Sequence, residues 1–401
     1  MNIHIRSSLR GFLFSICAAF PLFIHVTSSG FAQERKDPQI QTLIQQMQSA
    51  DKQARIAALK EVKRMGVEAK AAISALVQLL KEPEDDLREN AAEALGKMGA
   101  EARAAIPALI EVLKDRSASV RSNAAFALGQ IGVEAKPAAP ALSELLKDQN
   151  AWARGNAAFA LGRVGDAKTY LSSLIGLLKD PNENVRRDAA DAIGRAGVDA
   201  KEAVPALVVL LKDKSVPVRR YAAEALGRIG SEARIAVPGL IESLRDQEFV
   251  VRTYSAYALK RIGMEAKEAI PVWMGLLKDN HEHLRGYAAD ALGEIGPEAV
   301  IATPALIEAL KDQDRFVRVS AAKGLGKMGA EAKTAVQPLI ELLKDKEALV
   351  RSNAADALGR MGAEAKAAIP ALTEARKDQE TIVRLAAAGA IGKISSSGTK
   401  P

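Results

Sequence analysis

One phrase, copied along the chain, constrains the fold more than any other feature. Its clearest copy runs from Ala104 to Gly132 and reads AAIPALIEVLKDRSASVRSNAAFALGQIG. The copies share one arginine column and follow one another at intervals of 33 residues, with a single interval of 32. Eleven copies of so short a unit predict a solenoid, in which each unit buries its apolar face against its neighbours. The column arginines are Arg55, Arg88, Arg121, Arg154, Arg186, Arg219, Arg252, Arg285, Arg318, Arg351 and Arg384.

Each unit predicts two helices joined by a short polar turn. The first covers residues such as 102–114, and a proline recurs in one column of it, which bends the helix or displaces its start. The second runs from about Ser119 to Ile131. Its apolar residues, at positions −1, +3, +4, +7 and +10 from the column arginine, gather on one face of the helix. Gly132 follows and ends the helix.

A second glycine column lies in the middle of the second helix, eight residues after the arginine. It is occupied in nine of the eleven units, and the exceptions are Lys63 and Lys260. A glycine inside a helix costs about 1 kcal/mol relative to alanine. Its recurrence therefore predicts a tight backbone approach between neighbouring units.

The core of the phrase, V-R-x-x-A-A-x-A-L-G-x-I-G, resembles the HEAT repeat, specifically the short variety of the phycobilisome-lyase-like group, across residues 38–394. The resemblance implies an all-α fold, a right-handed α–α superhelix of about eleven two-helix repeats. It also implies a ladder between units, in which an aspartate ending the first helix pairs with the arginine of the second. Aspartate stands six residues before nine of the column arginines, but Ser49 and Glu82 replace it in the first two units, so the ladder should weaken there.

The two ends of the chain differ from the repeats. Residues 1–32 are typical of a secretory signal peptide, with Arg6 and Arg10 before an apolar run and Ala32 at the cleavage position before Gln33. An uncleaved membrane anchor is the alternative. We therefore expect an exported protein, periplasmic or extracellular, without a transmembrane segment after cleavage. The solenoid should cover residues 33–394, and Ser395–Pro401 should form a flexible tail.

Little in the sequence points to catalysis or to a metal. Cys17, the only cysteine, lies in the signal segment. His281 and His283 fall in a turn, where exposed polar residues are the simplest interpretation, and no second ligand cluster completes a site. The deoxyhypusine hydroxylases share the repeat, but the positions of their His-Glu pairs hold residues such as Arg220-Tyr221 here. We predict no catalytic residue, no metal ligand and no cofactor.

The residues that the scaffold leaves free lie on the second helix, at +2, +5 and +9 from the column arginine. In HEAT solenoids the second helices line the concave side, so these positions would form its floor. The candidate partner-binding residues are Phe126, Phe159, Tyr221, Tyr254, Tyr257, Tyr287, Arg163, Arg195, Arg228 and Arg261. Exposed aromatic rings in a groove act as interface anchors. A competing interpretation is that the rings cover small neighbours and that the basic residues favour the helix dipole.

The sequence therefore predicts a monomeric, non-enzymatic scaffold that binds a protein partner, acidic or extended, through its concave surface. The formal charge is +7, and loss of Arg6 and Arg10 with the signal leaves +5. Export argues against nucleic acid as the target. Two alternatives stay open: an enzyme or enzyme accessory of the lyase-like or hydroxylase-like kind, and a binder of an anionic polymer through the basic stripe.

Overall fold

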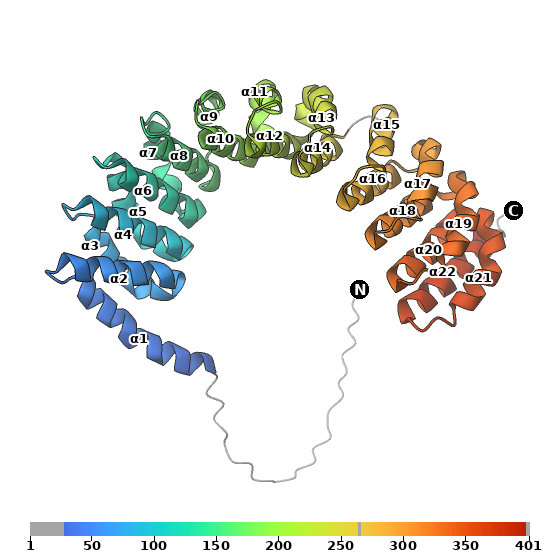
Figure 1. Cartoon of the computed structure of the whole chain (residues 1–401), viewed down its shortest axis with the longest axis horizontal. Coiled ribbons are helices and arrows are strands. Elements are labelled where there is room, and N and C mark those ends of the chain that lie inside the picture. Colours follow the sequence, from blue (N-terminus) through green and yellow to red (C-terminus); the bar gives the residue numbers. More distant parts are fainter. Residues whose placement is uncertain (1–27, 264–265, 398–401) are drawn as a thin grey trace, which may run out of the picture.

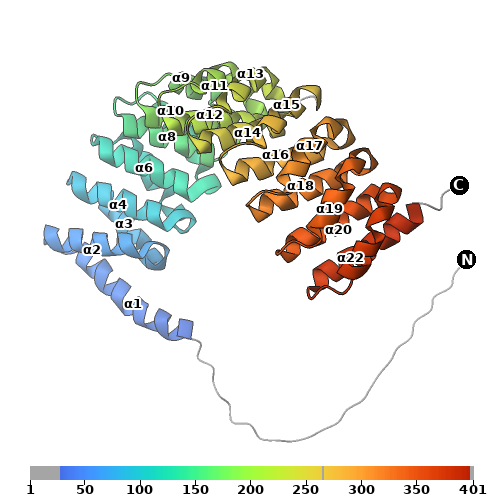
Figure 2. The same cartoon turned by 45° about the vertical axis from the view of Figure 1, so that its right-hand side comes forward.

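The structure is a computed structural model that describes residues 28–263 and 266–397. The regular secondary structure of these residues is entirely helical, and the helices stack in pairs along an open arc (Figure 1). The second helix of each pair lies on the inner side of the arc and the first on the outer side, a succession that the turned view also shows (Figure 2). The prediction of an all-α superhelical solenoid is confirmed.

The inner helices agree closely with the predicted second helices. Asp51, Asn150, Asn182 and Asp314 cap four of them by accepting hydrogen bonds from backbone N–H groups of the first turn. A glycine with positive φ ends each of the first ten units, as Gly132 does with φ 81°. The inner helices are α2 (Lys52–Met65), α4 (Asp85–Met98), α6 (Ala118–Ile131), α8 (Ala151–Arg163), α10 (Glu183–Ala196), α12 (Val216–Ile229), α14 (Phe249–Ile262), α16 (Glu282–Ile295), α18 (Arg315–Met328), α20 (Ala348–Met361) and α22 (Thr381–Ser397).

The outer elements differ from the single first helix predicted over residues 102–114. In most units a 3-10 segment comes first, and a short α-helix begins one residue before the proline column. Proline suits the first turn of an α-helix because it has no N–H to donate, so the proline displaces the start of the helix. The outer α-helices are α1 (Ser28–Met47), α3 (Ile73–Leu79), α5 (Ile106–Glu111), α7 (Ala139–Leu145), α9 (Leu171–Leu177), α11 (Val204–Leu210), α13 (Val237–Ser243), α15 (Ala266–Leu276), α17 (Thr303–Ala309), α19 (Val336–Leu342) and α21 (Ile369–Ala375). The 3-10 segments are η1 (Gly66–Ala72), η2 (Gly99–Ala105), η3 (Val112–Lys114), η4 (Gly132–Ala138), η5 (Gly197–Ala203), η6 (Gly230–Ala236), η7 (Gly296–Ala302), η8 (Gly329–Ala335) and η9 (Gly362–Ala368).

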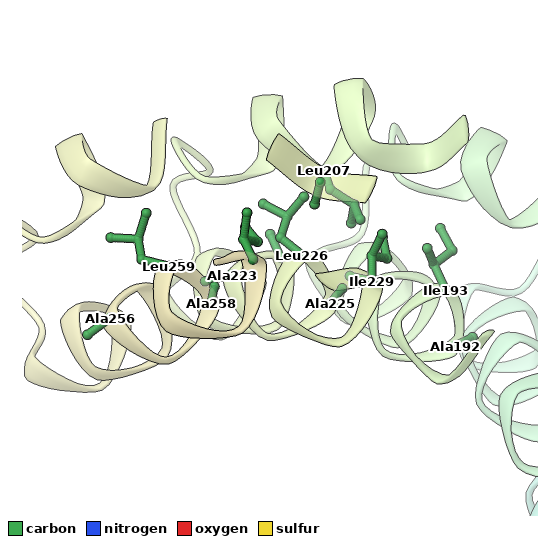
Figure 3. Close-up of a cluster of buried hydrophobic side chains, with 14 of the residues drawn as sticks. Ala192, Ile193, Leu207, Ala223, Ala225, Leu226, Ile229, Ala256, Ala258 and Leu259 are labelled. Atoms are coloured by element: carbon green, nitrogen blue, oxygen red, sulfur yellow. The ribbon is translucent and has the colours of Figure 1, made fainter. Parts of the chain in front are cut away.

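The core has two kinds of contact. Long side chains such as Leu226 point from the inner helices toward the outer layer, where Leu207 meets them (Figure 3). Alanines such as Ala225 lie between neighbouring inner helices. The mid-helix glycines make that second contact possible, since a Cβ on Gly194 would stand 2.9 Å from the Cα of Ala225. The predicted tight approach of units is therefore confirmed.

An arginine–aspartate ladder joins each unit to the next. Arg186 donates from Nε and Nη2 to the two carboxylate oxygens of Asp213, both at 2.8 Å, and from Nη1 to the backbone oxygen of Asp180. The same bidentate pairing repeats from Arg88–Asp115 to Arg351–Asp378. At the N-terminal end Arg55 makes a single bond to Glu82, at 3.0 Å, and its Nε is buried without a partner. The predicted weakening there is confirmed.

The stack widens at one place, between α14 and α16 (Figure 1). Lys260 occupies the glycine column of α14, and its Nζ pairs at 2.9 Å with Glu294 of α16 instead of letting the helices close. Trp273, only 3% exposed, replaces the leucine found at its position in neighbouring units such as Leu306. On the outer side, the cleft between α13 and α15 has a volume of about 720 Å³, against about 220 Å³ at the equivalent place between α17 and α19.

At the C-terminal end, α22 continues through Ser397, three residues into the segment predicted to be a tail. Hydroxyls of Ser396 and Ser397 donate to the carbonyl oxygen of Lys393 and so extend the helix by hydrogen bonding. Residues 398–401 of that tail and residues 1–27 of the predicted signal peptide lie outside the described residues, and α1 begins at Ser28. Over the described ranges no helix has the length and hydropathy to cross a bilayer.

Candidate binding surface

The aromatic residues of the +5 column lie on the inner wall, but they also pack against the preceding unit. A Cβ on Gly129 would stand 2.8 Å from the ring of Phe159, and one on Gly227 would stand 3.1 Å from the ring of Tyr257. Phe126 covers Gly96 in the same way and stacks on Phe159 with ring centroids 5.7 Å apart. Each ring is thus half-buried, with one side on a glycine of the neighbouring helix.

Two of the +2 tyrosines enclose an arginine that the sequence prediction missed. The guanidinium carbon of Arg220 lies 3.9 Å from the ring centroid of Tyr221 and 4.9 Å from that of Tyr254. Arg220 also donates from Nη1 to the hydroxyl of Tyr254 at 3.1 Å. The cation–π contacts hold this guanidinium on the inner wall. The sequence signal was the basic residue directly before Tyr221, one residue outside the three columns considered.

Tyr287 lies at the widened junction between α14 and α16. Its ring packs against Trp273 at 6.2 Å, and Lys260 Nζ lies 5.1 Å from its centroid. Burial raises the pKa of the Tyr287 hydroxyl. This tyrosine therefore fills the widened junction between α14 and α16 and lines neither of the two hollows described below, and its part in partner binding stays a prediction.

Three of the predicted aromatic residues do come together, in a concave pocket of about 710 Å³. Its floor includes the Asp188 carboxylate, which accepts a hydrogen bond from Arg187 Nε at 2.8 Å and whose pKa is raised by burial. We call this hollow the aromatic pocket. Its lining is Phe126, Asn156, Phe159, Arg187, Asp188, Asp191, Arg195, Val216, Pro217, Arg220, Tyr221 and Val250.

The four predicted arginines converge on a second, shallower hollow of about 640 Å³ at the C-terminal ends of α8, α10, α12 and α14. Its other lining residues are Val133 and four glycines, and we call it the arginine cleft. Arg195 and Arg228 share the Asp191 carboxylate at 3.0 Å each. Arg228 also pairs with Glu224 at 2.6 Å, whereas Arg163 donates to the backbone oxygen of Gly129.

The packing of these arginines explains why the basic column and the glycine column occur together. A Cβ on Gly162 would lie 3.1 Å from the Cδ of Arg195, and one on Gly194 would lie 3.5 Å from the Cδ of Arg228, so the apolar stems of these two arginines rest on the glycine of the preceding unit. The charged ends of Arg195 and Arg261 remain exposed to solvent. Arg195 lines both hollows, so the aromatic pocket and the arginine cleft form one continuous surface.

Of the two histidines predicted to be exposed turn residues, His283 is exposed, in the first turn of α16, whereas His281 at the turn is half-buried. His281 is half-buried and stacks on Phe249 with centroids 4.4 Å apart, and His283 follows at 5.2 Å. The stack of His281 on Phe249 thus joins the starts of α14 and α16. In the part of the chain that the structure describes, no group of three or more His, Cys, Asp or Glu side chains is placed to hold a metal ion.

Helical pairs stacked around a concave inner wall define the class of α-solenoid proteins. The HEAT repeats family model matches residues 40–116, 106–179, 171–260, 237–303 and 303–392, so this chain belongs to the HEAT-repeat family. Among curated protein sequences, none matches the chain at a significant level.

Many solved structures share the fold, including an engineered protein, importin beta and Kap95p. An engineered protein aligns over 89% of this chain and 98% of its own, with 22% identity and a TM-score of 0.52. Importin beta aligns over 91% of this chain with 16% identity and a TM-score of 0.58. Kap95p, in a structure with RanGDP, aligns over the same share with 16% identity and a TM-score of 0.55. The chain spans 56% of the length of each of these last two.

Proposed function

We propose that this protein is a non-enzymatic scaffold that holds a protein partner on its inner wall. HEAT-repeat solenoids generally mediate protein–protein interaction, and the structure of Kap95p with RanGDP is one case among its structural relatives. The observation that carries the proposal for this chain is the junction of two hollows at Arg195, one aromatic and one basic. Aromatic side chains and arginine are the residue types that contribute most to binding energy at protein interfaces.

We further propose that the protein acts after export, in the periplasm or outside the cell, and that it belongs to the phycobilisome-lyase-like group of HEAT repeats. The support for export is the charged start, apolar run and small-residue end of residues 1–32. N-terminal sequencing of the protein recovered from its natural compartment tests this, because cleavage before Gln33 is the expected result. An intact N-terminus on the recovered protein would contradict it.

Affinity capture with the purified chain, followed by mass spectrometry of the bound proteins, tests the scaffold role. A Phe126→Ala, Tyr221→Ala double variant should lose its specific partner, because both rings line the aromatic pocket. Trp152→Ala is the matched control, since Trp152 is 63% exposed and lines neither hollow. Equal capture by both variants, with helicity unchanged in each, would refute binding through the inner wall.

A further inference from the structure

The arginine cleft has a defined length. Its four arginines come from consecutive inner helices, α8 to α14, and the same column holds Gln130 in the preceding helix and Glu294 in the following one. Neutral and acidic residues therefore close the cleft at both ends. A ligand that lies along this cleft can therefore contact four guanidinium groups in a row.

The spacing of these groups follows from helix packing. Neighbouring helices lie about 8–10 Å apart, and the close approach of Gly162 to Ala192 and of Gly194 to Ala225 places these at the short end of that range. A polyproline II chain rises about 3.1 Å per residue with three residues per turn. Three residues of such a chain thus advance about 9 Å, and every third side chain points to the same side.

The small positive charge of the cleft favours a protein segment with carboxylates over a nucleic acid. Asp191 and Glu224 offset two of its four positive charges, which leaves a modest excess. Nucleic acids bind through many phosphate contacts and need a larger basic surface. Guanidinium groups pair with carboxylates in a bidentate geometry, and Arg261 and Arg163 at the two ends carry no acidic partner among the ion pairs of the described residues.

We propose that the arginine cleft binds an extended segment of the protein partner that carries an aspartate or glutamate at every third residue. This inference rests on the scaffold function proposed above and names the chemistry of its ligand. The segment crosses α8, α10, α12 and α14 in turn, one carboxylate to each arginine. Partner residues that flank the segment enter the aromatic pocket beside Arg195, because Arg195 lines both hollows.

Fluorescence anisotropy with two labelled 12-residue peptides of identical composition tests the proposal. The phased peptide repeats Glu-Pro-Ser four times. The clustered peptide has its four glutamates side by side. The purified full chain should bind the phased peptide about tenfold more tightly, because exposed ion pairs contribute about threefold each and the clustered peptide can reach fewer arginines. Equal affinity for the two peptides would overturn the proposal.

Matched variants locate the binding. An Arg163→Gln, Arg261→Gln double variant should weaken binding of the phased peptide about tenfold. A Lys327→Gln, Arg360→Gln double variant changes the same column in α18 and α20, outside the cleft, and should leave the affinity unchanged. An equal loss in both variants, or tighter binding of a 20-nucleotide single-stranded DNA than of the phased peptide, would also overturn the proposal.

The outcomes separate this inference from the scaffold role. If the phased peptide fails to bind while the pocket variant Phe126→Ala, Tyr221→Ala still loses its captured partner, the inner wall binds protein and only the acidic periodicity is wrong. If the peptide fails and that variant captures its partner normally, both proposals fail.

Discussion

The glycine column offers a direct test of how the units are held together. In α20 its glycine packs against the inner helix of the next unit, whereas in α22 no unit follows. Gly359 in α20 faces α22, and a Cβ there would stand 2.8 Å from the Cα of Ala390. Gly392 occupies the same column in the last helix, where a Cβ would meet nothing within 4 Å. The two substitutions by alanine therefore differ in packing and share the same change in helix propensity.

The magnitudes follow from these distances. Alanine is favoured over glycine in a helix by about 1 kcal/mol, so Gly392→Ala should stabilise the C-terminal units by about that amount. Gly359→Ala gains the same propensity but forces backbone apart, and overpacking of a filled core costs about 1–3 kcal/mol. We expect a net change between about zero and 2 kcal/mol destabilising, and a difference of about 1–3 kcal/mol between the variants.

Hydrogen exchange of the amides in α22 is the suitable assay. Units of a solenoid can open separately, so a single unfolding midpoint for the whole chain would average the effect away. Protection in α22 should fall in Gly359→Ala and rise in Gly392→Ala. If both variants shift protection in the same direction and by the same amount, close approach at the glycine is not what holds these units together.

Three further changes test other parts of the structure. Asp213→Asn leaves the buried guanidinium of Arg186 without its carboxylate and should lower the opening free energy that hydrogen exchange reports for α10 and α12 by about 3 kcal/mol, while Glu82→Gln, at the more exposed start of the ladder, should lower that of α2 and α4 by less than about 1 kcal/mol. Trp273→Leu restores the common residue of its column but should lower stability by about 2 kcal/mol, because α15 is already displaced and the smaller side chain leaves a void; a rise in thermal stability would contradict this. At ladder aspartates such as Asp115 and Asp213, burial raises the pKa, but hydrogen bonds from the arginine and from a backbone N–H together outweigh burial and hold the pKa below its unfolded value. Unfolding therefore takes up protons, and stability should be complete above about pH 5 and fall below about pH 4. Urea unfolding at pH 7, 5 and 3 checks that last prediction, and unchanged stability at pH 3 would refute it.

Most of the fold could be predicted because each unit repeats the same local signals. The inner helix predicted from about Ser119 begins at Ala118 and ends at Gly132, whose φ is 81°. The resemblance to HEAT repeats implied the ladder, and Ser49 and Glu82 in the aspartate column predicted its weak start. The split of the outer helix could not be decided in advance, since a proline near a helix start is compatible with either a bend or a later beginning.

The candidate surface was predicted less completely, because its geometry depends on pairs of units. The position of Phe159 in the +5 column predicts that it lies on the inner wall. The glycine that its ring covers, Gly129, lies 30 residues earlier, in the preceding unit. Arg220 is held on the inner wall by the rings of Tyr221 and Tyr254, which belong to two neighbouring units, so one column alone does not predict its position. The contacts of Tyr287 with Trp273 and Lys260 likewise come from other helices, and its own column does not predict them.

The lysine in the glycine column of α14 has a mechanical consequence. A rod of equal links shares a load evenly. Here the α14–α16 link, like the α2–α4 link where Lys63 occupies the same column, has no glycine contact and is joined by the Arg252–Asp279 pair, the Lys260–Glu294 pair and the Phe249–His281 stack. A pull on the two ends would concentrate its strain at that link. We therefore expect a change in the span of the solenoid to occur first at that link, while the units on either side keep their internal form.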